Sequence, residues 1–202
     1  MLDNKLGITD SVELARQEEK LTKLKAKKLF DSGDINRIEI GTFKGLAAIH
    51  HYLFSDVYEF AGKLRTVNLA KDNFQFAPRM FLEASLAYID RLPQKTFDDI
   101  IEKYVEMNIA HPFREGNGRA TRIGLDLILK QSLNQVVDWS QVDKDDYLLA
   151  MQRSPIKTTE IKHVLSAALT PKVNDRALYM KGIDHSYYYE GYMEFNTNEL
   201  DD

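Results

Sequence analysis

The sequence predicts an all-α protein in which a helical bundle surrounds one central buried helix and carries one small β-hairpin. Apolar residues recur at helical spacing along most of the 202-residue chain. In residues 118–133 the apolar positions nearly encircle the predicted helix, a pattern typical of a buried element. Strand-like alternation of apolar and polar residues is confined to residues 65–78. With 44% hydrophobic residues and no low-complexity run, we expect a single domain over residues 1–202.

The predicted helices are separated by residues that cap or end helices. Ala61-Gly62 would end the second helix. Thr96 and Asp99 have capping-box character and would open the fourth helix, which Pro112 helps to end. We predict helices over residues 11–29, 41–60, 81–92, 96–109, 118–133, 142–151, 161–169 and 175–181, the last ended by Gly182.

Residues 65–78 form the predicted hairpin, which we interpret as a flap. Phe74 and Phe76 alternate with polar residues after the turn-forming residues 71–73, and Pro78 stops the pattern. An isolated hairpin is marginally stable, so we expect it to pack on the helices and to leave one strand edge open. An open edge could pair with an extended peptide and so position a protein substrate. The alternative is a hairpin that only closes the core.

Composition excludes several classes of function. The net charge of -4 and the sequence pI near 5.8 give no electrostatic footprint for nucleic acid. The lysine-rich residues 20–28 alternate with leucines, as a solvated helix face would. No cysteine is present, which excludes disulfides and thiolate metal sites, and His50 and His51 fit a core or supporting pair. Residues 1–20 lack an apolar signal segment and no run could cross a membrane, so we expect a cytoplasmic protein.

Residues 111–122 (HPFREGNGRATR) bring a base, a cation ligand and an anion site into one short stretch. His111, with an unperturbed pKa of about 6.5, can take a proton from a hydroxyl near neutral pH. Two glycines flanking an asparagine let the backbone N–H groups at the start of a helix point at an anion. Two arginines three positions apart reach the same polyanion, and Glu115 suits a magnesium ion shared with phosphates.

This stretch resembles the signature of the Fic family, HPFx(D/E)GNGRxxR, and residues 54–65 resemble the family's F-x-D-V-Y-x-x-A-G-x-x-R segment. In that family the histidine deprotonates a protein hydroxyl, which attacks the α-phosphate of ATP, and the last arginine holds the γ-phosphate. The resemblance also implies the Fic fold and Mg²⁺ as the divalent metal. By position it implies a catalytic His111, a metal-binding Glu115 and a nucleotide-binding set made of Gly116, Asn117, Gly118, Arg119 and Arg122.

The C-terminal stretch Ser186 to Gly191 resembles the Fic inhibitory motif, (S/T)xxxE(G/N). In the family class that carries this motif C-terminally, its glutamate pairs with the last arginine of the signature. The resemblance therefore implies an inhibitory helix over residues 184–195 and an ion pair between Glu190 and Arg122. If Glu190 holds Arg122, the γ-phosphate loses its partner, and the α-phosphate is left out of line for attack.

The resemblance thus implies an autoinhibited protein adenylyltransferase that moves AMP from ATP to Ser, Thr or Tyr hydroxyls, including its own. One alternative uses the same site, with Glu190 orienting a water that removes AMP from a modified protein. A non-enzymatic alternative is a nucleotide-sensing, peptide-binding module. Kinase-like relatives lack the glycine at Gly116, and phosphocholine-transferring relatives do not need Arg122. The target protein, the direction of the reaction and the oligomeric state stay open, and a homo-oligomer is compatible with the sequence.

Overall fold

The computed structural model describes residues 2–71 and 74–200. In this described part, eight α-helices and two small antiparallel sheets are present, which confirms the predicted helical bundle. The helices are α1 (Ser11–Asp31), α2 (Phe43–Phe54), α3 (Leu82–Asp90), α4 (Phe97–Ala110), α5 (Asn117–Leu133), α6 (Lys144–Arg153), α7 (Thr159–Ser166) and α8 (Arg176–Tyr189). The strands are β1 (Ala70–Lys71), β2 (Phe74–Gln75), β3 (Val136–Val137) and β4 (Leu169–Thr170).

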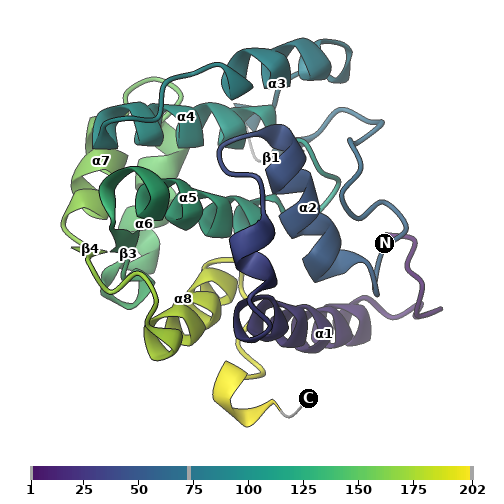
Figure 1. Ribbon diagram of the computed structural model, residues 1–202. Coiled ribbons are helices and arrows are strands. Elements are labelled where there is room, and N and C mark those ends of the chain that lie inside the picture. The colour runs from purple at the N-terminus through teal and green to yellow at the C-terminus, as the bar shows by residue number, and fades with distance from the viewer. Residues whose placement is uncertain (1, 72–73, 201–202) are drawn as a thin grey trace.

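Helix α5 is the central element, as the apolar residues around its circumference predict. It packs against α2, α4 and α8, and it runs through the middle of the bundle with α4 above it and α1 and α8 below (Figure 1). Ala120 and Leu129 on this helix are fully buried. The start of α5, which follows the signature loop, therefore lies deep in the molecule.

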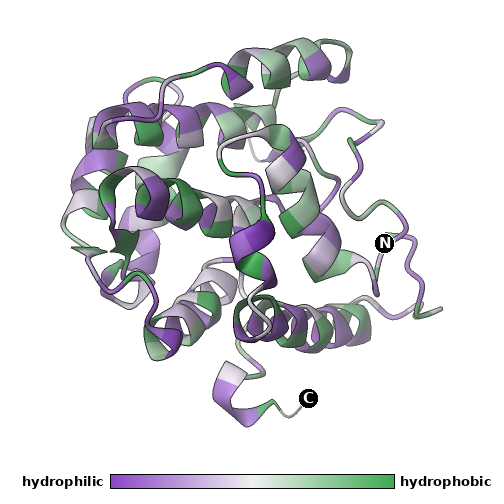
Figure 2. Ribbon diagram, in the orientation of Figure 1, coloured by the Kyte–Doolittle hydropathy of each residue, from purple (hydrophilic) through white to green (hydrophobic). Residues whose placement is uncertain are grey.

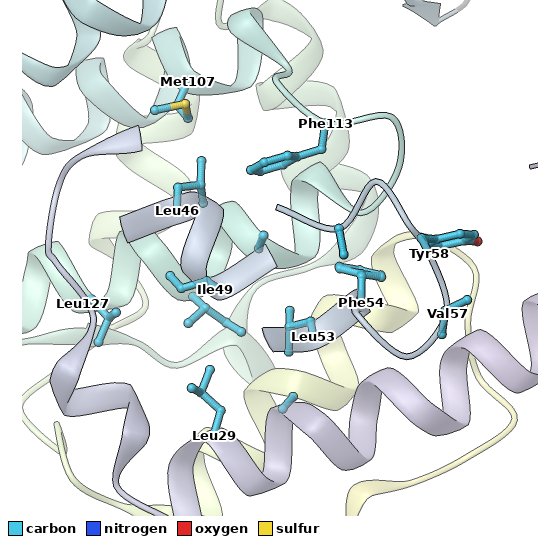
Figure 3. Close-up of a cluster of buried hydrophobic side chains, with 14 of the residues drawn as sticks. Leu29, Leu46, Ile49, Leu53, Phe54, Val57, Tyr58, Met107, Phe113 and Leu127 are labelled. Carbon is cyan, nitrogen blue, oxygen red and sulfur yellow. The ribbon is translucent and has the colours of Figure 1, made fainter. Parts of the chain in front are cut away.

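The larger core cluster lies around α2 and joins it to α1, α5 and the signature loop. Figure 3 shows Leu53 and Phe54 of α2 between Leu29 of α1 and Phe113 of the loop, and all four side chains are almost completely buried. Burying a side chain of this size stabilises the fold by about 1.5–3 kcal/mol. Figure 2 shows the polar and apolar residues alternating along the turns of α1, because only one side of that helix faces this core.

Two local sequence signals act as predicted at the ends of α4. The Thr96 hydroxyl accepts a hydrogen bond from the Asp99 N–H at 3.1 Å, and the Asp99 carboxylate accepts one from the Thr96 N–H at 3.0 Å, which completes the capping box. The helix ends at Ala110, and His111 adopts a left-handed conformation with φ 48° directly before Pro112. The histidine thus projects from a helix end.

The prediction for α2 was too long, since the helix ends at Phe54 and not at residue 60. Residues 55–62 form turns, in which the N–H groups of Val57 and Tyr58 both donate to the Phe54 carbonyl. The helical spacing continued in the sequence because Val57 and Tyr58 are buried in the same core as α2. The buried apolar residues of these turns therefore continued the helical spacing in the sequence, although the segment is not helical.

The prediction that Gly182 ends a short last helix was wrong. Helix α8 begins after the N-cap Asp175 and continues through Gly182 to Tyr189. A Cβ at Gly182 would lie 3.2 Å from the Trp139 ring, so the glycine allows close packing within the helix. Of the predicted inhibitory segment 184–195, only the first part is helical, and it forms the last turns of α8.

The prediction of one hairpin was also incomplete. The flap is present, with Lys71 paired to Phe74 and Ala70 to Gln75, while the predicted turn residues 72–73 lie outside the described residues. A second antiparallel pair joins β3 to β4. These two-residue strands come from distant parts of the chain and are too short to show an alternation of apolar and polar residues, so the sequence did not predict them.

The lysine-rich face predicted on α1 is interrupted by a buried lysine. Lys23 is almost completely buried, and its Nζ lies 3.0 Å from a Glu19 oxygen and 3.3 Å from an Asp184 oxygen. It also donates to the Phe195 carbonyl. Lys23 therefore holds the C-terminal tail, while Lys20 and Lys28 are exposed as predicted. In the described ranges, no helix combines the length and the apolar character that a bilayer crossing requires.

Candidate active site

The signature loop between α4 and α5 is fixed by its own side chains. The Asn117 side chain accepts from the Phe113 N–H and donates to the Phe113 carbonyl, both at 2.8 Å. The Phe113 ring is fully buried and stacks on the His50 ring at a centroid distance of 3.9 Å. The Asn117 side chain therefore braces the loop, which leaves its backbone N–H as the group that can face an anion.

His50 supports the same loop from α2, as a supporting histidine and not as a metal ligand. Its Nδ1 accepts from the Gly62 N–H at 2.9 Å, so its Nε2 is the protonated nitrogen that donates to the Glu115 carbonyl at 2.8 Å. Burial lowers the pKa of His50 to about 3. The imidazole is therefore neutral, and one tautomer ties α2 to the loop.

His111 lies at the end of α4 with a neutral side chain. Its Nδ1 donates to the Asn108 carbonyl at 3.3 Å, which leaves the lone pair of Nε2 free to accept a proton. Its ring stacks on Phe76 of the flap at 3.7 Å. Burial lowers its pKa to about 4, against the opposing effects of the Asn108 carbonyl and of the Glu190 carboxylate. The left-handed backbone of a non-glycine residue costs about 1–3 kcal/mol, which is typical of functional sites.

Two glycines shape the N-terminal turn of α5. Gly116 has φ 73°, and a Cβ there would lie 2.3 Å from the Phe54 ring. A Cβ at Gly118 would lie 2.2 Å from a carboxylate oxygen of Glu190. The carboxylate of Glu190 thus lies over the helix N-terminus, where the N–H groups and the helix dipole favour an anion.

Arg122 carries the ion pair that the sequence predicts. Its Nη2 lies 2.6 Å from a Glu190 oxygen and donates to the Ser186 carbonyl at 2.8 Å. Its Nε donates to the Ser186 hydroxyl at 2.6 Å, and its Nη1 to the Tyr147 hydroxyl at 3.3 Å. The predicted pair between Glu190 and Arg122 is therefore present, and Ser186 also accepts hydrogen bonds from the same guanidinium.

Arg119 is enclosed more tightly than the sequence indicates. Its side chain is fully buried, and its Nη1 lies 2.6 Å from the Glu18 carboxylate. Its Nε lies 2.8 Å from Glu190, within ion-pair distance but outside hydrogen-bond geometry. Three aromatic rings face the guanidinium at 4.6 to 5.2 Å, those of Phe54, Tyr187 and Tyr192. The predicted nucleotide contact is thus occupied by carboxylates and rings, and Arg119 holds Glu190 in place.

Glu190 is the C-cap residue of α8 and is oriented by the glycine that follows it. Gly191 has φ 92°, its N–H donates to the Tyr188 carbonyl, and the Tyr192 N–H donates to the Tyr187 carbonyl at 3.1 Å. These two bonds form a Schellman end. Burial alone would raise the pKa of Glu190, but the two guanidinium groups beside it outweigh that effect and hold the pKa below its usual value. The carboxylate is therefore ionised at neutral pH.

Glu115, the predicted metal ligand, is the one acidic residue of the loop 111–122 and is partly accessible. Its side chain is 40% exposed and accepts from the Gly116 N–H at 2.9 Å and from Arg119 at 3.2 Å. Among the residues that the structure describes, no group of three or more acidic, histidine or cysteine side chains could hold a metal ion. A metal here would depend on one protein carboxylate together with substrate and water oxygens, which suits Mg²⁺.

The flap covers the site from the side of His111. The Ala77 N–H donates to the Ile109 carbonyl at 3.0 Å, which attaches the flap to the last turn of α4. In the described part of the chain β1 pairs only with β2, so each strand has one unpaired edge. The structure therefore brings the predicted base against the flap, and the predicted acid and Glu190 against the N-terminus of α5.

Three residues of the site were missed from the sequence. Glu18 of α1 accepts from Arg119 and from the hydroxyls of Tyr58 and Tyr192, and it is almost completely buried. An acidic residue within the apolar stripe of α1 was the signal that could have indicated a buried pair. Tyr147 contacts Arg122 from a helix with no motif of its own, and Tyr192 contacts Arg119 from the position directly after the inhibitory motif.

Comparison with known proteins places this arrangement in a family. A model of the Fic/DOC family matches residues 42–129. Protein adenylyltransferase VbhT of Bartonella schoenbuchensis is 30% identical over 173 residues, which cover 80% of this chain and 35% of the relative. Probable protein adenylyltransferase y4lH of Sinorhizobium fredii is 30% identical over 166 residues, which cover 76% of this chain and 83% of the relative.

Solved structures agree on the fold. BepC of Bartonella tribocorum, crystallised with bound AMPPNP, superposes with a TM-score of 0.68 at 20% identity and covers 85% of this chain and 93% of that one. A Fic domain from Bartonella quintana with bound ADP superposes with the same TM-score, 0.68, and the match covers 88% of this chain and 93% of that one. The chain spans about a third of the length of VbhT but most of the length of y4lH. The chain belongs to the Fic/DOC family.

Proposed function

We propose that this chain is a protein adenylyltransferase that moves AMP from ATP to Ser, Thr or Tyr hydroxyls of proteins, including its own. The observation that carries the proposal is a neutral His111 with a free Nε2. It lies in the loop that leads into the glycine-lined N-terminus of α5, the helix that also carries Arg122. The names of two relatives, protein adenylyltransferase VbhT and probable protein adenylyltransferase y4lH, support the same reaction.

In the proposed reaction, the oxygen of the target hydroxyl forms a bond to the α-phosphorus of ATP. The bond from that phosphorus to the oxygen bridging the α- and β-phosphates breaks, and pyrophosphate leaves. The hydroxyl proton passes to Nε2 of His111, which is unprotonated at neutral pH because its pKa is lowered. Backbone N–H groups at the start of α5 hold the phosphates, and Arg122 holds the γ-phosphate.

Two further parts of the site serve this reaction. Glu115 would hold Mg²⁺ together with phosphate oxygens, and the bound ion would neutralise part of the phosphate charge. The open edge of the flap would hold the target as an added strand, which brings its hydroxyl toward His111 without a strong sequence requirement. Mg²⁺, ATP and a protein partner are therefore part of the proposal.

Glu190 would act as the inhibitor of the same site. Its carboxylate occupies the space over the helix N-terminus and holds Arg122, so a γ-phosphate has to displace it. Hydrolytic removal of AMP from a modified protein is a second candidate, favoured by the ionised carboxylate at this position. The oxygen of a water would then bond to the phosphorus of protein-bound AMP while Glu190 takes a proton from that water. The bond from phosphorus to the protein oxygen would break, and that oxygen would take a proton from His111, which has to be protonated for this step.

Radiolabelled ATP tests the proposal and separates it from the alternatives. Protein incubated with ATP labelled at the α-phosphate should become labelled, whereas ATP labelled at the γ-phosphate should leave it unlabelled. Label from the γ-phosphate would indicate phosphate transfer and contradict the proposal. Release of AMP from pre-labelled protein, lost on Glu190→Gln, would assign hydrolytic removal of AMP to this site. Binding of ATP with no label in wild type, in Glu190→Gly or on added proteins would favour a nucleotide-sensing module.

A further inference from the structure

Arg65 is a buried arginine whose hydrogen bonds in the described chain all go to backbone carbonyls. Its side chain is only 2% exposed, yet it lies outside the group of charges around Glu190. A buried guanidinium is costly unless its N–H groups are satisfied. In this protein main-chain carbonyls accept those hydrogen bonds, so the role of Arg65 follows from which segments of the main chain it binds.

Arg65 binds three consecutive carbonyls at the catalytic loop. Its Nε donates to the His111 carbonyl at 2.7 Å, its Nη2 to the Ala110 carbonyl at 3.1 Å, and its own backbone N–H to the Pro112 carbonyl at 2.9 Å. These carbonyls belong to the peptide groups around the one residue of the loop that is left-handed without being a glycine. The bonds therefore fix the strained conformation that aims the His111 ring.

The same guanidinium also binds both sides of the flap. Nη1 donates to the Val67 carbonyl at 2.6 Å, before β1, and Nη2 donates to the Ala77 carbonyl at 2.5 Å, after β2. The planar fork of an arginine can bridge several acceptors in fixed directions, which the ammonium group of a lysine cannot do. One side chain thus connects the loop that carries the base to the strands beside which a target would lie.

We propose that Arg65 is a positioning residue that holds His111 and the flap as one unit, so that a hydroxyl presented at the flap edge meets the imidazole. The proposal rests on the proposed transfer to a flap-bound protein. Because Arg65 is buried and donates to main-chain carbonyls, it would act through His111 and the flap. Its loss should therefore lower the rate of transfer while ATP still binds, because Glu115, Arg122 and the start of α5 are held by other contacts.

The test compares Arg65→Lys and Arg65→Gln in the Glu190→Gly background, with Arg91→Lys as a matched control at an exposed arginine after α3. A misplacement of about 1 Å can cost about 10²-fold, so we expect kcat for transfer to fall by about that factor. The KM for ATP should stay unchanged. Hydrogen exchange of the Ala77 amide, which donates to the Ile109 carbonyl, should accelerate, while that of α1 amides should not.

An unchanged kcat in a folded Arg65 variant would overturn the proposal, and so would unchanged exchange at the Ala77 amide. Loss of the folded state in both variants, measured by thermal unfolding, would also overturn it, because Arg65 would then be a stability residue. If the Glu190→Gly parent transfers no AMP, the proposed function fails. The exchange measurement then still decides whether Arg65 couples the flap to the loop.

Discussion

Removal of the Glu190 carboxylate by Glu190→Gly should release Arg122 for the γ-phosphate. The carboxylate lies 2.6 Å from Arg122 and 2.8 Å from Arg119, and its side chain is 24% exposed. Breaking a buried ion pair typically costs about 3–5 kcal/mol, and the partial exposure favours the lower end of that range. Since each 1.36 kcal/mol is a factor of ten, about 3 kcal/mol corresponds to about 10²-fold more of the competent state.

Intact-mass spectrometry of purified protein with ATP and Mg²⁺ measures the resulting addition of AMP. We expect the initial rate to rise about 10²-fold in Glu190→Gly. It should rise less in Glu190→Gln, which keeps the shape of the side chain and one hydrogen-bond acceptor. Glu190→Ala controls for the added backbone freedom of glycine. Equal rates in wild type and all three variants would refute the reasoning, because the ion pair would then not limit access to Arg122.

Four further predictions follow from the same contacts. His111→Ala in the Glu190→Gly background should abolish AMP transfer but leave the Kd for ATP unchanged by calorimetry; residual transfer at the parent rate would exclude this base. Gly116→Ala should lower Tm and destabilise the fold by roughly 1–3 kcal/mol or more, because φ is 73° and a Cβ would lie 2.3 Å from a phenylalanine ring. Gly191→Ala, with φ 92° but open space around the Cβ, should cost only about 1 kcal/mol and should raise AMP transfer by loosening the end of α8; a slower rate would contradict this. The free energy of unfolding should fall as pH drops from 6.5 toward 3, by up to about 1.4 kcal/mol per pH unit from His50, because the unfolded chain binds a proton that the folded chain, with a pKa of about 3, does not. His50→Gln should remove that part of the slope in urea titrations, and an identical slope would contradict it.

The sequence was most informative where function concentrates rare residue types in a short segment. The capping residues of α4 and the buried character of α5 follow from local patterns, the pair between Glu190 and Arg122 follows from the resemblance to the Fic inhibitory motif, and the structure contains each of them. A helix N-terminus and a glycine turn determine much of their own geometry, so a motif of this kind can be interpreted without the rest of the fold.

The remainder depends on contacts between distant segments. Nothing near Arg119 indicates that Glu18 is its partner, and nothing near His111 indicates that Arg65 holds its carbonyl. Gly182 was misinterpreted as a helix end because its reason is the Trp139 ring beside it, not its own backbone. The partners of Arg119 and His111 and the role of Gly182 depend on packing and pairing between distant segments. Such contacts produce no periodic pattern in the sequence.

The charges around the N-terminal part of α5 explain why Glu190 and a γ-phosphate would compete for Arg122. Two buried arginines are neutralised by Glu18 from α1 and by Glu190 from the end of α8. Glu190 follows the last residue of α8 and precedes a glycine, whereas Glu18 lies within α1, so we expect Glu190 to be the partner that a triphosphate replaces. Glu18 stays with Arg119, which keeps that side of the site in place when Glu190 leaves.

The ratio of the affinities for ATP and ADP, measured by calorimetry with Mg²⁺ in wild type and in Glu190→Gly, tests this claim most directly. A γ-phosphate that gains Arg122 as a charged hydrogen-bond partner should gain about 1.5–3 kcal/mol. We therefore expect the preference for ATP over ADP to be about 10- to 10²-fold greater in Glu190→Gly than in wild type. The same ratio in both proteins would contradict the account, because Glu190 and the γ-phosphate would then not compete for one guanidinium.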